Sequence, residues 1–254
     1  HDALPICIYP AVGGGLALIA WYYPFLLPVA AVPVALAVIF ALDNPEPEAK
    51  GTLREYITVT LRSAWQPQVL LLFAVSILTF VLIYGPFLSY LPFLLERSFA
   101  ASSAVIGFVI AAASVSTAIA SFALGALSRR LGTRSLVVFA FLLYAISLAG
   151  MPLAPTLPLL VIPIVIFGTA NGMNIPSFLV ILTDFAPIEH RGAFMSINGM
   201  VLRMGQTLGP VLAGIVVTTV GIEAAFYAGA ALALVVFGVL AAWLRPEAGL
   251  PPRP

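Results

Sequence analysis

Two apolar runs joined by a short basic loop decide the fold of this chain. They lie in residues 104–151, AVIGFVIAAASVSTAIASFALGALSRRLGTRSLVVFAFLLYAISLAGM. The runs 104–127 and 135–151 carry no charged side chain, whereas the loop between them carries Arg129, Arg130 and Arg134. Each run is long enough to cross the hydrocarbon core, which takes about 17 to 25 mostly apolar residues. The stretch therefore predicts a transmembrane helical hairpin whose turn lies at the membrane surface.

The composition of the whole chain extends this prediction beyond the hairpin. Hydrophobic residues make up 62% of the 254 residues, charged residues 8%, and the mean hydropathy is +1.12. Soluble domains are about 45–50% apolar and about 25% charged, so this chain has too few charges to cover a water-exposed surface. The net charge of +1 gives no basis for a nucleic-acid partner. The single cysteine, Cys7, excludes an intrachain disulfide.

Charged residues divide the chain into eight apolar segments, which we expect to form an all-α bundle of transmembrane helices. Short connections between most segments predict antiparallel neighbours. The charged stretch 43–66 is the exception, and we interpret it as a linker between the end of an N-terminal bundle, residues 1–42, and a C-terminal bundle, residues 67–254. The segments are Ala3–Ala20, Pro24–Leu42, Val69–Leu95, Ala104–Leu127, Ser135–Met151, Leu157–Thr183, Phe194–Val220 and Ala224–Leu244.

The distribution of Lys and Arg predicts the orientation, because cytoplasmic loops carry an excess of both. Of the 11 such residues, Arg203 lies within a helix and Arg97 follows the third segment on one side of the membrane. The other nine lie on the opposite side if the linker 43–66 is cytoplasmic. We therefore expect a multi-pass protein of the plasma membrane, the inner membrane in a bacterial cell, with a cytoplasmic C-terminus.

The basic loop of the hairpin is the most specific motif. We expect Gly125 to end one helix and Gly132 to allow the tight turn into the next. The loop resembles the signature loop of the major facilitator superfamily (MFS), Gly-x-x-x-Asp-Arg/Lys-x-Gly-Arg/Lys-Arg/Lys. Gly125, Arg130, Gly132 and Arg134 match it, whereas Arg129 replaces the acidic residue and Thr133 a basic one. The resemblance implies the second copy of that motif, between helices eight and nine, and a role in cytoplasmic gating.

A second motif resembles the family's loop between helices ten and eleven. Asp184-Phe-Ala-Pro-Ile-Glu-His-Arg-Gly192 has the form Asp-x-x-Pro-x-x-x-Arg-Gly at a cytoplasmic helix end. Asp184 and Arg191 are placed to pair with Arg130 across neighbouring helices, and partial burial would strengthen such a cluster. The alternative is a solvated turn whose charges are not coupled.

A repeated motif gives the register of the helices. Tyr9-Pro-Ala-Val-Gly-Gly14 resembles the antiporter motif of family helix five, although Tyr9 replaces its first glycine, and Gly209–Gly214 is its counterpart in helix eleven. The resemblance then numbers the segments as helices five to twelve, and we expect about four more helices to precede them in the complete transporter. The residues that carry this motif are Pro10, Gly13, Gly14, Gly209, Pro210 and Gly214.

Polar and aromatic residues within the segments are candidates for a substrate cavity. Arg203 is the charged residue inside an apolar run, and intramembrane charge usually faces a bundle interior or an aqueous cavity. A snorkelling arginine that reaches the cytoplasmic interface is the alternative. A bend is expected at Gly85-Pro86. Four-residue glycine spacings at Gly168/Gly172 and Gly205/Gly209 predict close helix packing. The cavity candidates are Tyr84, Phe87, Asn171, Asn174, Arg203, Gln206 and Thr207.

The function implied by the resemblance is secondary transport of a small organic solute by alternating access, with the helix-five motif favouring proton-coupled multidrug efflux. We expect no catalytic residue, cofactor or metal site. The expected partners are the lipid bilayer, the preceding helices, a small-molecule substrate and a proton or another coupling ion. Two alternatives stay open at this point. They are an intramembrane lipid-modifying enzyme, with polar groups clustered at Asp184–Arg191, and a transporter-like sensor or non-transporting remnant.

Overall fold

The computed structural model of the chain describes Pro33 and residues 65–185 and 191–243. Apart from Pro33, Trp65 and Gln66, the segments predicted within 1–42 and the linker 43–66 therefore lie outside the described residues. Pro10, Gly13 and Gly14 also lie outside them. Six helical spans within the described ranges are long and apolar enough to cross a membrane. They coincide with the six predicted segments from Val69–Leu95 onward, and most extend a few residues beyond the predicted ends. The described part of the chain is an all-α bundle, as predicted.

The first span changes from an α-helix to a π-helix at the predicted bend. It consists of α4 (Pro67–Leu82), the π-helix η2 (Ile83–Tyr90) and α5 (Leu91–Phe99). Pro86 has no N–H for the usual bond to the carbonyl four residues back, and its ring crowds that carbonyl, so a wider turn replaces the α-helical one. The Ser89 hydroxyl donates to the Tyr84 carbonyl at 2.6 Å. The helix therefore stays continuous through a segment whose backbone bonding is irregular.

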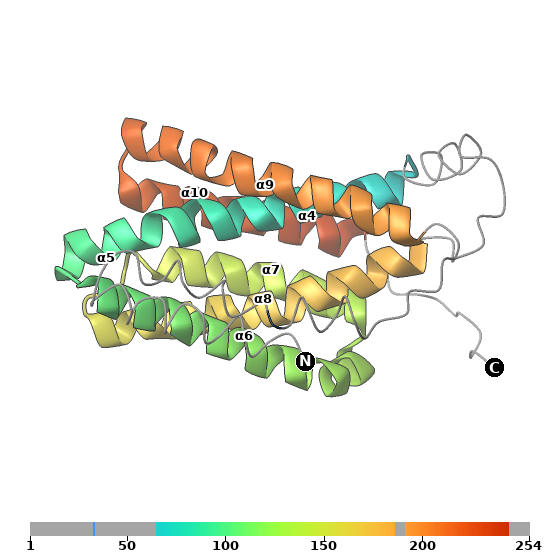
Figure 1. Ribbon diagram of the computed structural model, residues 1–254, viewed down its shortest axis with the longest axis horizontal. Coiled ribbons are helices and arrows are strands. Elements are labelled where there is room, and N and C mark those ends of the chain that lie inside the picture. Colours follow the sequence, from blue (N-terminus) through green and yellow to red (C-terminus); the bar gives the residue numbers. More distant parts are fainter. Residues whose placement is uncertain (1–32, 34–64, 186–190, 244–254) are drawn as a thin grey trace.

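The other spans are unbroken helices joined by short connections. They are α6 (Ser103–Leu131), α7 (Thr133–Gly150), α8 (Leu157–Phe185), α9 (Arg191–Thr219) and α10 (Ile222–Trp243). Figure 1 shows the six spans side by side, with the turn between α6 and α7, the break between α8 and α9 and the start of α4 at one end. That end is the one predicted to be cytoplasmic.

One local prediction is wrong. Gly125 does not end the first helix of the hairpin, because α6 continues through it to Leu131. Gly132 ends the helix instead, with a φ of +77°, a backbone conformation that favours glycine. Basic residues in the last turn, Arg129 and Arg130, interact favourably with the carbonyl end of the helix. The apolar pattern ends at Leu127, whereas the helix continues for about one more turn, to Leu131.

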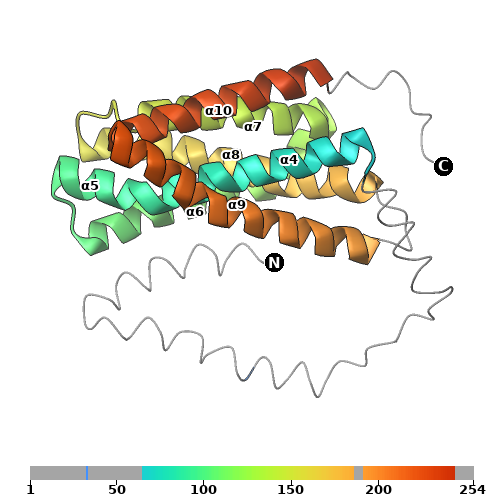
Figure 2. The same ribbon diagram turned by 90° about the horizontal axis from the view of Figure 1, so that it is seen from above.

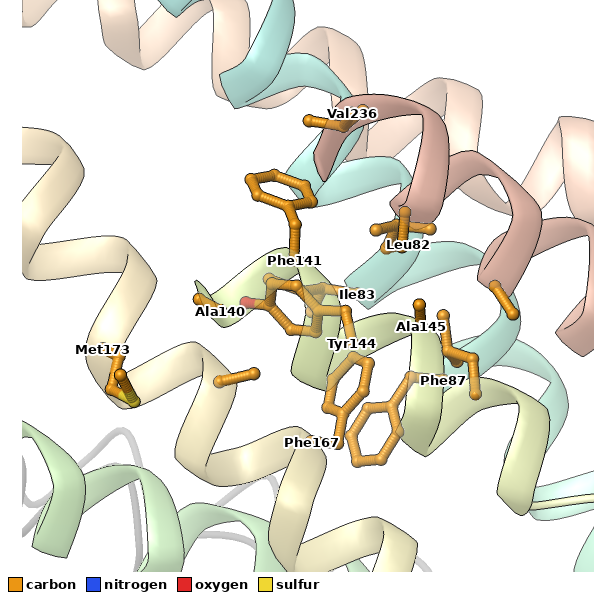
Figure 3. Packing of buried hydrophobic residues seen from close by; sticks show 14 of the residues in the cluster. Leu82, Ile83, Phe87, Ala140, Phe141, Tyr144, Ala145, Phe167, Met173 and Val236 are labelled. Carbon is orange, nitrogen blue, oxygen red and sulfur yellow. The ribbon is translucent and has the colours of Figure 1, made fainter. Parts of the chain in front are cut away.

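The α8 helix packs against both α6 and α7, α7 also packs against α10, and α9 packs against α4 and η2 of the first span. An aromatic cluster fills the centre (Figure 3). The Phe87 ring stacks on Phe167 with centroids 4.1 Å apart, and Tyr144 meets Phe167 edge-on at 5.1 Å. Figure 2 shows that α9 crosses α4, the first helix of the first span, at an angle.

Candidate functional site

A polar stripe on α9 is the main exposed polar feature in the middle of a described helix. Arg203 and Thr207 are exposed and Gln206 is half-buried. Arg203 Nη1 donates to Gln206 Oε1 at 2.8 Å, and the Thr207 hydroxyl donates to the Arg203 carbonyl at 3.0 Å. All three belong to the face predicted from the 3.6-residue period. The structure thus brings together three of the predicted cavity residues.

The depth of Arg203 argues against snorkelling to the side predicted to be cytoplasmic. It lies about 18 Å along α9 from Arg191, at about 1.5 Å rise per residue. Its side chain bonds to Gln206, one turn further from the Arg191 end of the helix. A snorkelling arginine would extend in the opposite direction, toward the nearer interface. The guanidinium group is therefore held at mid-helix depth.

Beyond Thr207, residues of the same α9 face contact the π-helix of the first span. The Tyr90 hydroxyl donates to the Pro210 carbonyl at 3.5 Å, and a Cβ added to Gly214 would lie 2.8 Å from the same hydroxyl. Pro210 and Gly214 continue the face that carries Arg203. On the first span, Tyr84 is half-buried and stacks with Phe80, with ring centroids 6.0 Å apart. Phe80 was not among the predicted residues, although its four-residue spacing from Tyr84 is visible in the sequence.

The remaining cavity candidates lie inside the bundle. Phe87 belongs to the aromatic cluster and is 4% exposed. In Figure 3 the Tyr144 hydroxyl points from that cluster toward α8, where it donates to Asn171 Oδ1. Asn174, 1% exposed, donates from its amide to Thr79 Oγ1 at 3.2 Å. These residues connect α4, α7 and α8, and their role in the described conformation is interhelical packing.

Sequence reasoning also missed a buried polar contact between the first span and α9. The Ser76 hydroxyl donates to Asn198 Oδ1 at 3.4 Å, and both side chains are buried. Asn198 lies between apolar residues in the predicted segment. A signal existed, because a polar amide in a transmembrane helix commonly bonds to another helix. What the sequence did not show was its partner.

The predicted gating residues gather at the end of the bundle that is predicted to be cytoplasmic. Arg129 and Arg130 are exposed at the end of α6, Arg134 is half-buried in the first turn of α7, and Asp184 is exposed near the end of α8. Arg134 and Asp184 both make polar interactions. The Arg191 side chain lies outside the described residues, so its pairing with Asp184 or Arg130 stays a prediction.

The fold and the motifs at this end of the bundle agree with the family resemblance. A match to a family model establishes the membership. The model of the Major Facilitator Superfamily matches residues 90–254. The chain belongs to this superfamily. Within residues 65–185 and 191–243, no group of three or more His, Cys, Asp or Glu side chains is arranged to hold a metal ion.

Relatives of this MFS chain carry the names of transporters. The multidrug efflux pump Tap of Mycolicibacterium fortuitum is 25% identical over 186 residues, 72% of this chain and 44% of that protein. A protein of Bacillus subtilis named for metabolite transport, YwtG, is 31% identical over 102 residues, 40% of this chain and 22% of that protein. The glucose transporter GlcP of Staphylococcus epidermidis is 28% identical over 99 residues, 39% of this chain and 22% of that protein. The chain spans less than half the length of these relatives. Together they indicate a membrane transport protein rather than an enzyme.

Proposed function

We propose that the protein exports small organic solutes by alternating access, as a multidrug-type pump coupled to protons. Family membership supports the transport mechanism, since MFS proteins move two bundles around a site between them. The similarity to an efflux pump over 72% of the chain supports the direction and the broad substrate range. Its partners are then the bilayer, the preceding helices, a small-molecule substrate and the proton.

The observation that carries the proposal is the exposed Arg203–Gln206 pair at mid-helix depth. A guanidinium group facing hydrocarbon at this depth would cost several kcal/mol, on the order of 3 by insertion measurements. Placed on a solute pathway between two bundles, the same group is solvated by water or by substrate. A role of Arg203 in a solute pathway therefore avoids the free-energy cost of a guanidinium group in hydrocarbon, whereas a purely structural role would not.

Proton coupling requires a titrating group within the membrane, and the carboxylates of the described spans all lie near helix ends. Within residues 65–185 and 191–243 the carboxylates are Glu96, Asp184 and Glu223, each exposed near a helix end. A carboxylate that carries protons through the membrane must reach its middle. We propose that this group belongs to the helices that precede the described bundle.

Transport is tested with the full-length protein in everted membrane vesicles. A panel of neutral, cationic and anionic fluorescent solutes is supplied outside, and a proton gradient, acidic inside, is imposed. We expect gradient-driven accumulation of at least one solute, abolished by a protonophore. Accumulation that persists without the gradient contradicts proton coupling. Tight solute binding without any movement would identify a sensor instead of a pump.

The proposed orientation places the loop after α6 in the cytoplasm. In a Cys7→Ser background, a cysteine at Thr133 should react with an impermeant thiol reagent only after cell lysis. A matched cysteine at Ser98, exposed at the opposite end of the first span, should react in intact cells. Labelling of position 133 from outside would reverse the orientation.

A further inference from the structure

The charge on the α9 stripe has a neutral partner. Arg203 Nη1 donates to the amide oxygen of Gln206, which fixes the guanidinium group but does not neutralise it. The described carboxylates Glu96, Asp184 and Glu223 all lie near helix ends. Within residues 65–185 and 191–243, mid-membrane depth therefore carries one positive charge and no described carboxylate to balance it.

The hydrogen-bonding groups of this pair are suited to an oxyanion. The guanidinium keeps further N–H donors beyond the one that Gln206 accepts, since arginine has five. Gln206 uses its oxygen for Arg203, so its NH₂ remains to donate to the same ligand. Arginine binds carboxylate, sulfonate and phosphate groups through parallel hydrogen bonds that match their planar or tetrahedral oxygens.

We propose that the substrates of this transporter are organic anions. The anionic group binds the Arg203 guanidinium group and the Gln206 amide. This inference rests on the proposed transport function and narrows its substrate class. A cationic drug would lose affinity through repulsion by Arg203, and a neutral analogue would lack the charge-assisted hydrogen bonds.

Three probes that share one ring system test the charge preference. They are 2-naphthoate, 2-naphthamide and 2-naphthylmethylammonium, and the measurement is equilibrium binding to the purified full-length protein. The wild type should bind 2-naphthoate at least about tenfold more tightly than the amide, the ratio expected for hydrogen bonds to a charged group. Arg203→Gln should remove this preference, and Arg203→Lys should retain part of it because the charge remains.

Two further variants are controls. Tyr84→Leu removes ring surface on the first span without changing charge, so the preference for 2-naphthoate over 2-naphthamide should remain. Arg97→Gln is the matched control, since Arg97 is exposed in the last turn of α5 and far from the stripe. It should leave every affinity unchanged. Folded yield of each variant is measured by size-exclusion chromatography, and Arg203→Lys carries the test if Arg203→Gln fails to fold.

The outcomes distinguish this inference from the proposed function. Equal binding of the three probes by the wild type, or an unchanged preference for 2-naphthoate in Arg203→Gln, overturns the anion site. Gradient-driven movement of 2-naphthamide without any preference for 2-naphthoate would overturn the anion site and leave the transport function in place. An Arg203-dependent preference without gradient-driven movement of any probe would support the site and overturn the pump.

Discussion

Two glycine-lined helix contacts, one between α6 and α8 and the other between the first span and α9, are built differently. Between α6 and α8, a Cβ added to Gly168 would lie 2.1 Å from the Ala113 carbonyl oxygen, and one added to Gly172 would lie 2.3 Å from that of Thr117. Between the first span and α9, the corresponding distances are 2.6 Å from Gly205 to Ile77 O and 2.9 Å from Gly209 to the Gly85 nitrogen. The α6/α8 contact is the closer of the two.

Hydrogen bonding increases the difference. The Thr117 hydroxyl donates to the Gly168 carbonyl at 2.9 Å and that of Ser121 to the Gly172 carbonyl at 3.2 Å, so two bonds join α6 to α8. Pro176 explains the second, because it lacks the N–H that would otherwise bind the Gly172 carbonyl. The contact between the first span and α9 also has two bonds, but both are longer, 3.4 Å from Ser76 to Asn198 and 3.5 Å from Tyr90 to Pro210. It also meets the π-helix η2, so we expect this contact to adjust more easily than the one between α6 and α8.

The largest effect is expected from Gly168→Ala. Its Cβ would meet a backbone oxygen in a helix that is itself bonded to α8, so neither helix can move away cheaply. We expect a loss of more than about 3 kcal/mol, beyond the usual cost of overpacking, and little folded protein. Yield and thermal unfolding of the purified protein measure this. Gly238→Ala, with open space around its Cβ, is the control. Wild-type stability in Gly168→Ala would mean that the contact is not rigid.

A moderate effect is expected from Gly209→Ala. The new methyl group would lie 2.9 Å from the Gly85 nitrogen and 3.0 Å from Val81 O, which the neighbouring π-helix can relieve by a small shift. We expect a cost of about 1–3 kcal/mol, seen as a lower unfolding temperature with recoverable folded protein. Destabilisation equal to that of Gly168→Ala would remove the distinction between the two contacts.

A smaller effect is expected from Ser121→Ala, which leaves the Gly172 carbonyl without its donor. The expected cost is about 1 kcal/mol. Pro176→Ala restores a backbone N–H four residues after Gly172, so Ser121→Ala should cost less in that background. The two costs are compared in a double-mutant cycle. Thr169→Val is the control, because the Thr169 hydroxyl bonds within its own helix, to Val165 O. Simple additivity would show that the hydroxyl does not replace the missing N–H.

The smallest effect is expected from Tyr90→Phe, which removes the long bond to Pro210. The loss should be below about 0.6 kcal/mol, the average for side-chain hydrogen bonds between membrane helices. Gly214→Ala should be mildly destabilising alone and nearly neutral in Tyr90→Phe, since its Cβ would meet only the Tyr90 hydroxyl oxygen. A larger loss for Tyr90→Phe than for Ser121→Ala would reverse the order of the two contacts.

Much of this architecture follows from local sequence. Apolar length and positive-inside loops gave the six described spans and their order, because a membrane helix must satisfy its own backbone and cover itself with apolar side chains. The glycine spacings predicted both close contacts, which the structure confirms at Gly168/Gly172 and Gly205/Gly209. The Gly85-Pro86 pair predicted a bend, and the structure has a π-helix at that place, because the missing N–H acts within a single turn.

Other features depended on which helices meet. Asn171 and Asn174 share a helix face in the sequence, as cavity residues would, yet their bonds to Tyr144 and Thr79 lie inside the bundle. Phe80 packs on Gly205 of α9, a neighbour that only the meeting of the first span with α9 provides. The end of α6 at Gly132 instead of Gly125 likewise depended on backbone conformation, to which hydropathy is insensitive.

By itself the sequence determined the helices, their order, the family signature and the residues that a membrane interior makes costly, because these depend on local composition and short spacing. The tertiary structure decided which polar groups are used up in contacts between helices and which remain available. The Asn174 amide donates to Thr79 of another helix, whereas Arg203 donates to Gln206 of its own helix. That distinction depends on contacts between residues far apart in the chain, and it separates the residues that join helices from those that we propose bind a solute.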